Sequence, residues 1–144
     1  RQLKEHSINR RYRAIVTGVL KDDEGTIEGA IGRDKKDRKK MAITADGKPA
    51  VTHYRVLQRF KYYTYVECVL ETGRTHQIRV HMASIGHPLL GDEVYGRKTD
   101  KYKCEGQCLH AMTLGFHHPR TGEYIEVNAP LPPYFEHLLA VLES

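Results

Sequence analysis

Residues 70–96 constrain the fold more than any other part of the chain, because they pack many polar side chains into a turn and one short helix. The segment reads LETGRTHQIRVHMASIGHPLLGDEVYG and contains two arginines, three histidines and a glutamine. Thr75 is a suitable N-cap for a helix that begins at His76. Gly86 supplies a stop signal at the other end, and Pro88 follows shortly after it. The pattern predicts one helix with a dense set of hydrogen-bond donors.

Arg79 lies at the edge of the predicted buried face of this helix. Helical spacing gives one apolar stripe, which consists of Ile78, Met82 and Ile85. The adjacent stripe consists of His76, Arg79, Val80 and Ala83. A half-buried guanidinium needs an anion to pair with. Two kinds of partner fit: a carboxylate of this chain in a structural salt bridge, or an anion that belongs to a functional site.

Length and charge set broader limits. The 144 residues suffice for one domain with a real core. The net charge of +5 and the pI of about 9.1 favour a polyanionic partner such as nucleic acid. The three cysteines, an odd number, do not suggest a disulfide framework. We find neither a membrane-spanning apolar run nor a signal peptide, and therefore expect no membrane association and a cytoplasmic location.

The distribution of apolar residues predicts mixed α and β structure. Alternating, branched or turn-bounded segments predict strands over residues 12–20, 26–31, 50–60, 62–70, 109–117 and 123–127. A last helix is predicted over residues 134–142, with a buried face that consists of Phe135, Leu138, Leu139 and Leu142. Residues 1–10 are typical of a helix that begins before Arg1, so we expect a piece of a longer protein. The basic run at 33–40 fits either a solvated loop or a polyanion contact.

Several other patterns favour structural roles. Cys104, Cys108 and His110 resemble half a zinc site, but a fourth ligand at the expected spacing is missing. We therefore expect free thiols and no metal. The adjacent His117 and His118 favour the closure of a hairpin over chemistry. No phosphate loop, dinucleotide fingerprint or serine elbow is present.

Two further patterns leave alternatives open. Asp92 follows a glycine in a loop, where a catalytic role and a loop-ordering role fit equally well. Tyr62, Tyr63 and Tyr65 fall in a predicted strand, where core or sheet-surface positions are favoured over base stacking.

Four segments together resemble the RluA/RluD-type pseudouridine synthases, which isomerise uridine in ribosomal and some transfer RNAs. GRTHQIRVHMASIGHPLLGDEVYG resembles the third motif of that family. In the right order, the other matching segments are RRYRAIVTG, DRKKMAITADGKPAVTHYRVL and CLHAMTLGFHHPRTGEYIEVNAPLP. The resemblance covers essentially the whole chain and is closest to the D type, which favours large-subunit ribosomal RNA as the target.

The resemblance implies a fold and a chemistry. It implies an α+β fold, with a mixed, largely antiparallel sheet flanked by helices. An aspartate attacks the target uridine, and the base detaches, rotates and rejoins the ribose through carbon 5. No metal or organic cofactor is implied, and the expected protein is a monomer that takes part in rRNA processing. The target nucleotide must be flipped out of its helix, which costs a few kcal/mol. Phosphate contacts and stacking on an aromatic ring offset that cost.

The resemblance also implies residue roles. Tyr12 corresponds to the tyrosine that stacks on the flipped base and is a candidate proton acceptor, and Arg79 to the basic residue that pairs with the catalytic aspartate. Arg74, His76 and Gln77 are expected to meet an RNA phosphate. Leu109 is expected to lie against the base. The residues expected to contact RNA backbone are Arg38, Lys39, Lys40 and Lys48.

One departure from the family pattern changes the expectation for this chain. The family's first motif, His-Arg-Leu-Asp with the nucleophile, does not occur in the sequence. We therefore expect residues 1–144 to be the C-terminal portion of a catalytic domain, with the aspartate upstream, and to have no activity alone. On this basis the partner of Arg79 is expected to lie outside the chain. The alternative is a non-catalytic RNA-binding module or degenerate paralogue.

Overall fold

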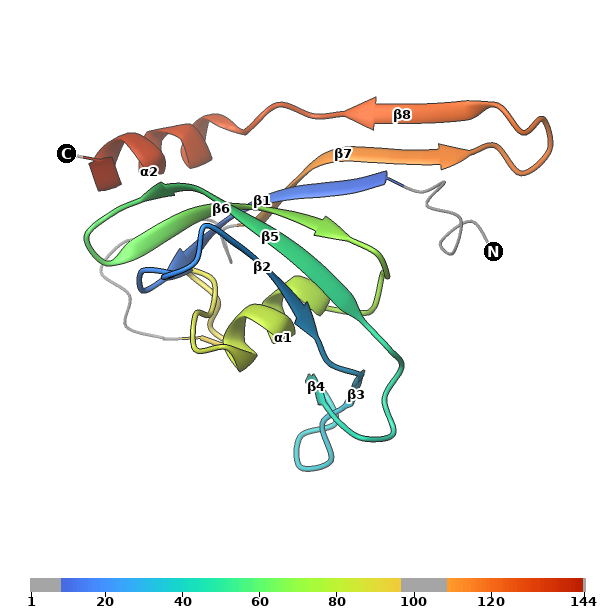
Figure 1. Cartoon of the computed structure of the whole chain (residues 1–144), viewed down its shortest axis with the longest axis horizontal. Helices are drawn as coiled ribbons and strands as arrows, with labels where there is room; N and C mark the ends of the chain where they lie inside the picture. Colours follow the sequence, from blue (N-terminus) through green and yellow to red (C-terminus); the bar gives the residue numbers. More distant parts are fainter. Residues whose placement is uncertain (1–8, 97–108, 144) are drawn as a thin grey trace.

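The computed structural model describes residues 9–96 and 109–143 and shows an antiparallel sheet with a helix on each face (Figure 1). The six strands of the main sheet, in spatial order, are β2 (Glu24–Glu28), β5 (Val51–Arg59), β6 (Tyr63–Leu70), β1 (Asn9–Thr17), β7 (Leu109–His117) and β8 (Tyr124–Asn128). A separate hairpin consists of β3 (Ile31–Arg33) and β4 (Met41–Ile43). The helices are α1 (Gln77–Ser84) and α2 (Pro133–Glu143). The predicted α+β fold class is confirmed.

The sheet has a core on each side because side chains alternate along its strands. Ala14 and Val16 of β1 pack in a cluster with Met82 of α1. Ile15, between them, packs in a second cluster with Phe135 of α2. Covered on both faces, β6 is buried at seven of its eight positions. The two helices lie on opposite sides of the sheet (Figure 1).

Most predicted elements are confirmed with shifted ends, but one hairpin was missed and the expected N-terminal helix needs correction. The β3–β4 hairpin was not predicted, because each strand has only three residues and the basic run lies between them. Asn9 and Arg10 belong to β1 rather than to the expected N-terminal helix, whose other residues lie outside the described part of the chain. No helix among the described residues has the length and apolar character needed to cross a membrane.

The start of α1 differs from the prediction that Thr75 is its N-cap. The N-cap is His76, which has φ 56° and ψ 26° and makes no side-chain capping hydrogen bond. The side chain of Gln77 ties the turn instead: its Oε1 accepts hydrogen bonds from the Thr72 hydroxyl at 2.7 Å and from the Arg74 N–H at 3.0 Å. Its amide nitrogen donates to the Val51 carbonyl at 2.9 Å. Gln77 therefore anchors the turn to β5.

The other end of α1 follows the prediction, with one exception. Gly86 has φ +87°, and its N–H donates to the Ala83 carbonyl at 3.0 Å. The predicted apolar stripe is buried at Ile78 and Met82, whereas Ile85 is 39% exposed. Ile85 is the C-cap residue, so it has already left the helical face that meets the sheet.

His81 fixes α1 against the sheet. Its imidazole is fully buried, with Nδ1 at 2.8 Å from the Thr52 hydroxyl and Nε2 at 3.0 Å from the Gly29 carbonyl. Burial lowers the pKa of His81 below its ordinary value of 6.5, and the hydrogen bond to Gly29 opposes this shift without cancelling it. The ring is therefore neutral in the folded protein near neutral pH.

We expect the free energy of unfolding to fall as the pH is lowered from about 7.5 to about 5. The unfolded chain takes up a proton at His81 near pH 6.5, whereas the folded protein does so only at lower pH. The contribution of neutral His81 to stability is therefore fully present above its unfolded pKa of about 6.5, and it is lost as the pH falls toward the lower pKa of the folded protein. Urea unfolding at several pH values measures the loss, and NMR titration of the His81 ring assigns it. A ring midpoint above 6.5 in the folded protein would contradict the prediction.

Candidate active site

A cavity of about 300 Å³ opens between the sheet and the start of α1. The residues that line it are Tyr12, Leu70, Arg74, His76, Gln77, Ile78, Arg79 and Leu109. They come from β1, the end of β6, the turn and first helical turn of α1, and the start of β7. The structure thus brings together six of the predicted site residues, which lie up to 97 positions apart in the sequence, from 12 to 109.

An irregularity in the sheet lies beside Tyr12. Arg11 is opposite Thr113 and Tyr12 is opposite Ala111, so β7 carries one extra residue, Met112, at this point. Such bulges bend a strand and redirect side chains. The ring of Tyr12 is partly buried against the core, as is Leu109. The cavity therefore has an aromatic and aliphatic wall next to its cationic side.

Arg79 pairs with Asp92 of the same chain, which corrects the expectation that its partner lies outside. Nε donates to Asp92 Oδ2 at 2.9 Å and Nη2 donates to Oδ1 at 3.0 Å, a side-on bidentate geometry. The side chains are 12% and 0% exposed. The sequence did not reveal this partner, because a loop separates Asp92 from the helix and no local pattern predicts the path of that loop. The structural salt bridge was therefore the correct alternative for this contact.

Asp92 also orders the loop that carries it. Its Oδ1 accepts hydrogen bonds from the N–H groups of Val94 and Tyr95, both at 3.0 Å. Burial alone would raise the pKa of the Asp92 carboxyl, but the hydrogen bonds from Arg79 and the two backbone groups outweigh it and lower the pKa. The carboxylate is thus ionised and held on all sides, which favours the loop-ordering alternative.

Tyr95 is a site residue that the sequence did not reveal. Its hydroxyl lies 2.9 Å from His76 Nδ1 and accepts a hydrogen bond of 2.9 Å from the Met41 N–H. The guanidinium carbon of Arg79 lies 4.9 Å from the centroid of its ring. The sequence points to Tyr95 only by its position, three residues after Asp92 and within the segment of residues 70–96.

His76 and Arg74 form the polar rim of the cavity. Burial, together with the charge of Arg79, lowers the pKa of His76, so its imidazole is neutral near pH 7. Arg74 is held by a hydrogen bond of 2.7 Å from its Nε to the Pro49 carbonyl. Gln77, in contrast, is 2% exposed, and its side chain is hydrogen-bonded within the protein. It therefore holds the turn in place and does not present its amide to a ligand.

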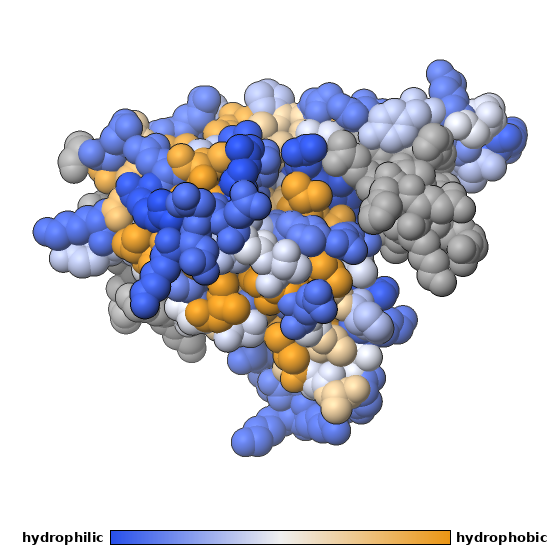
Figure 2. Space-filling view, in the orientation of Figure 1, coloured by the Kyte–Doolittle hydropathy of each residue, from blue (hydrophilic) through white to orange (hydrophobic). Residues whose placement is uncertain are grey.

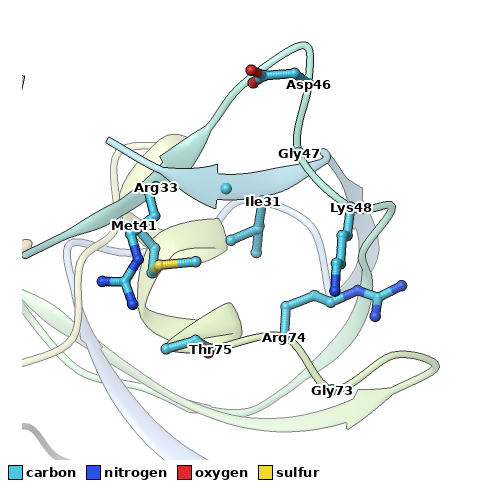
Figure 3. Close-up of a pocket in the computed structure, with 10 residues that line it drawn as sticks. Ile31, Arg33, Met41, Asp46, Gly47, Lys48, Gly73, Arg74 and Thr75 are labelled. Carbon is cyan, nitrogen blue, oxygen red and sulfur yellow. The ribbon is translucent and has the colours of Figure 1, made fainter. Parts of the chain in front are cut away.

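A second pocket of about 370 Å³ lies between the β3–β4 hairpin and the turn before α1, and Arg74 lines both cavities. Arg74 and Lys48 bring their cationic ends to the same side of this pocket, whereas Asp46 lies on the far turn and points away from them (Figure 3). Two cationic ends on one side of the pocket, with the Asp46 carboxylate turned away from them, favour an anionic ligand.

The basic run forms the loop of the β3–β4 hairpin and does not line the first cavity. Asp34 Oδ1 accepts hydrogen bonds from the N–H groups of Lys36 and Asp37 at 2.8 and 3.2 Å. The acidic residues of the run thus fold the loop, and Arg38 and Lys39 are exposed. Lys40 extends its ammonium to 5.7 Å from the centroid of the Tyr95 ring. Hydrophilic side chains cover the projecting end of the hairpin (Figure 2).

Other candidate groups have structural positions. His118 Nδ1 accepts the Arg120 N–H at 3.1 Å in the β7–β8 turn, and His110 Nε2 lies 3.0 Å from the Ala129 carbonyl. Burial raises the pKa of the Cys68 thiol to about 12, so this thiol is unreactive. Cys104 and Cys108 lie outside the described residues. Within the described ranges, no cluster of three or more His, Cys, Asp or Glu residues could hold a metal ion.

The tyrosines of the β5–β6 hairpin divide as the alternation predicts. Tyr63 and Tyr65 are each 8% exposed and belong to the core on the α2 side. Tyr62 precedes the strand and is 65% exposed. The ring of Tyr62 carries the Lys61 ammonium at 5.4 Å from its centroid.

Comparison with known proteins finds relatives named as RNA pseudouridine synthases. Residues 1–84 match the family model of RNA pseudouridylate synthase. The chain is 58% identical to the uncharacterized RNA pseudouridine synthase YlyB of Bacillus subtilis (strain 168), over 99% of the chain and 47% of that protein. It is 48% identical to ribosomal large subunit pseudouridine synthase D of Neisseria meningitidis (strain Z2491), over 98% of the chain and 40% of that protein. The chain thus spans less than half the length of these relatives.

A solved structure agrees with these matches. Human RNA Pseudouridylate Synthase Domain Containing 1 superimposes with a TM-score of 0.79 at 28% identity, over 98% of this chain and 68% of the human chain.

We expect Asp92→Ala to destabilise the protein by about 3 kcal/mol, because it leaves a largely buried guanidinium without its partner. Asp92→Asn keeps the shape and one acceptor oxygen, and we expect a loss of about 1–2 kcal/mol. Asp23→Asn is the matched control: Asp23 also pairs with an arginine, at 2.9 Å, but its side chain is 87% exposed. That change should cost less than about 0.5 kcal/mol. Urea unfolding provides the comparison, and equal losses in all three variants would contradict the structural role of Asp92.

Proposed function

The chain belongs to the RNA pseudouridylate synthase family, and we propose that it carries the larger part of an active site that converts uridine in RNA to pseudouridine. The observation that supports this most is the cavity itself. It joins Tyr12 and Leu109, which are expected to stack on and lie against a flipped base, with Arg79, which is expected to pair with the catalytic aspartate. Its volume of about 300 Å³ and its mixed aromatic and cationic lining suit a nucleotide.

In the proposed reaction, the bond between the ribose C1′ and the uracil N1 breaks, the base rotates, and C1′ bonds to C5. C5 then loses its proton and N1 gains one, so the product is an isomer of the substrate. We propose that the nucleophilic aspartate belongs to a segment N-terminal to Arg1. Tyr12 stacks on the base and accepts the C5 proton directly or through water.

The pair with Asp92 changes the proposed role of Arg79 without removing it. A guanidinium has five N–H donors, and the two bonds to Asp92 use Nε and one N–H of Nη2. Arg79 also lines the cavity, and we propose that its remaining N–H donors, two on Nη1 and one on Nη2, meet a second carboxylate there. Asp92 then fixes the plane of the guanidinium, and the catalytic aspartate takes the remaining donors.

We propose that the RNA approaches from the side of the β3–β4 hairpin. Arg38, Lys39 and Lys40 on its loop, with Lys48 and Arg74 around the second pocket, form a series of cations beside the cavity. Such contacts bind phosphates without reading sequence. His76 adds a polar group at the rim, and Gln77 positions the turn. We propose large-subunit ribosomal RNA as the target, in keeping with the relatives named ribosomal large subunit pseudouridine synthase D. We also propose a monomeric state and a cytoplasmic location.

We expect residues 1–144 alone to release no tritium from RNA that contains [5-³H]uridine, and the protein extended to the start of its gene to release it. The physical reason is the missing nucleophile, since orientation and charge cannot replace a covalent step. Filter binding of the same RNA checks that each protein still binds. Tritium release by the isolated chain would contradict the upstream aspartate, and RNA binding without release by the full-length protein would favour a non-catalytic RNA-binding module.

In the full-length protein, we expect Arg79→Lys to lower kcat by about 100-fold or more, because an ammonium cannot hold Asp92 and a second carboxylate in one plane. RNA affinity should change by less than about 3-fold, since phosphate contacts supply most of it. Arg55→Lys is the matched control, because Arg55 pairs with Glu67 at 3.2 Å on the opposite face of the sheet. Single-turnover tritium release and filter binding separate the two effects. Comparable kcat values in the two variants would refute the role of Arg79.

A further inference from the structure

We propose that Tyr95 is a positioning residue that couples the β3–β4 hairpin to the guanidinium of Arg79. Through Tyr95, contact of RNA with the hairpin and alignment of the active site become one event. This inference rests on the proposed function, because it assigns a catalytic role to Arg79 and an RNA-binding role to the hairpin.

The hydroxyl of Tyr95 connects two separate elements. It accepts a hydrogen bond of 2.9 Å from the N–H of Met41, the first residue of β4. It also lies 2.9 Å from Nδ1 of His76, the N-cap of α1. Because the pKa of His76 is lowered, the imidazole is neutral and can accept the phenolic proton at Nδ1. The hydroxyl accepts a hydrogen bond from the hairpin, and with the neutral ring protonated at Nε2 it donates one to the start of the helix.

The ring of Tyr95 contacts one cation from the helix and one from the hairpin. The guanidinium carbon of Arg79 lies 4.9 Å from the ring centroid, and the Lys40 ammonium lies 5.7 Å from it. Both distances are within the range of a cation–π interaction. Lys40 precedes β4 directly and is one of the residues proposed to contact RNA. A phosphate that draws Lys40 outward would therefore act on the same ring that supports Arg79.

The backbone of Tyr95 closes the arrangement. Its N–H donates to Asp92 Oδ1 at 3.0 Å, and the same carboxylate oxygen accepts the Nη2–H of Arg79 at 3.0 Å. Arg79, Asp92 and Tyr95 thus form a closed circuit in which each group touches the other two. A tyrosine that only filled space would not need both its hydroxyl and its ring engaged by polar groups from different elements.

Two substitutions separate the hydroxyl from the ring. Tyr95→Phe keeps the aromatic face under Arg79 and removes the bonds to Met41 and His76. We expect it to raise KM by about 10-fold with kcat almost unchanged, because the hairpin is released while Arg79 stays supported. Tyr95→Leu removes both functions, and we expect kcat to fall by a further factor of about 10. The matched controls are Tyr62→Phe and Tyr62→Leu, which alter an exposed tyrosine whose ring also carries a lysine.

Steady-state tritium release by the full-length protein provides KM and kcat, and a double-mutant cycle tests the coupling itself. If Tyr95 links the hairpin to the site, Lys40→Ala and Tyr95→Phe will have non-additive effects on log KM. Additive effects, or a Tyr95→Leu variant with wild-type kcat, would overturn the proposal.

Hydrogen exchange provides a readout that does not depend on activity. The Met41 amide should exchange faster in Tyr95→Phe than in the wild type, and at an unchanged rate in Tyr62→Phe. Unchanged protection in Tyr95→Phe would overturn the proposal even if Tyr95→Leu fails to fold. If the wild-type protein releases no tritium, the proposed function fails, whereas the exchange experiment still tests the connection of Tyr95 to the hairpin.

Discussion

The bidentate ion pair of Arg79 and Asp92 is the constraint on which the geometry of the candidate site depends. Asp92 is fully buried and Arg79 is 12% exposed, so both charges have lost most of their hydration. A pair of this kind adds little net stability over an apolar pair of similar size, because desolvation offsets the attraction. Its effect is geometric. Two parallel hydrogen bonds fix the plane of the guanidinium at the edge of the cavity, and the same carboxylate fixes the start of the next loop.

The ion pair also affects which residues can attract a polyanion. Arg79 and Asp92 together are neutral, so they contribute little to the attraction of a polyanion over distance. In the proposed function, that attraction comes from the hairpin loop and from Lys48 and Arg74, whose cationic ends lie on the same side of the second pocket (Figure 3). On this proposal, long-range attraction of RNA and local alignment of the site depend on different residues. Tyr95 lies where the two groups meet, with one cation of each group against its ring.

The sequence predicted much of this site because many of its determinants are local. The density of polar residues before α1, the stop at Gly86 and the alternation of β1 each have a physical cause within a few positions. Residue pairs formed by the tertiary path could not be predicted in the same way. Asp92 reaches back across a loop to Arg79, and Tyr95 spans from that loop to Met41. The N-cap was assigned to Thr75 because composition favoured it, whereas the turn is tied by the buried amide of Gln77.

The left-handed backbone of His76 has a further consequence. Among the described residues it is the one non-glycine with positive φ, and this conformation costs a side chain with a Cβ about 1 kcal/mol or more relative to glycine. Glycine would adopt it freely, so folding alone does not account for an imidazole at this position. The first turn of α1 therefore holds its histidine against the preference of its own backbone, and in this conformation the imidazole lies 2.9 Å from the Tyr95 hydroxyl.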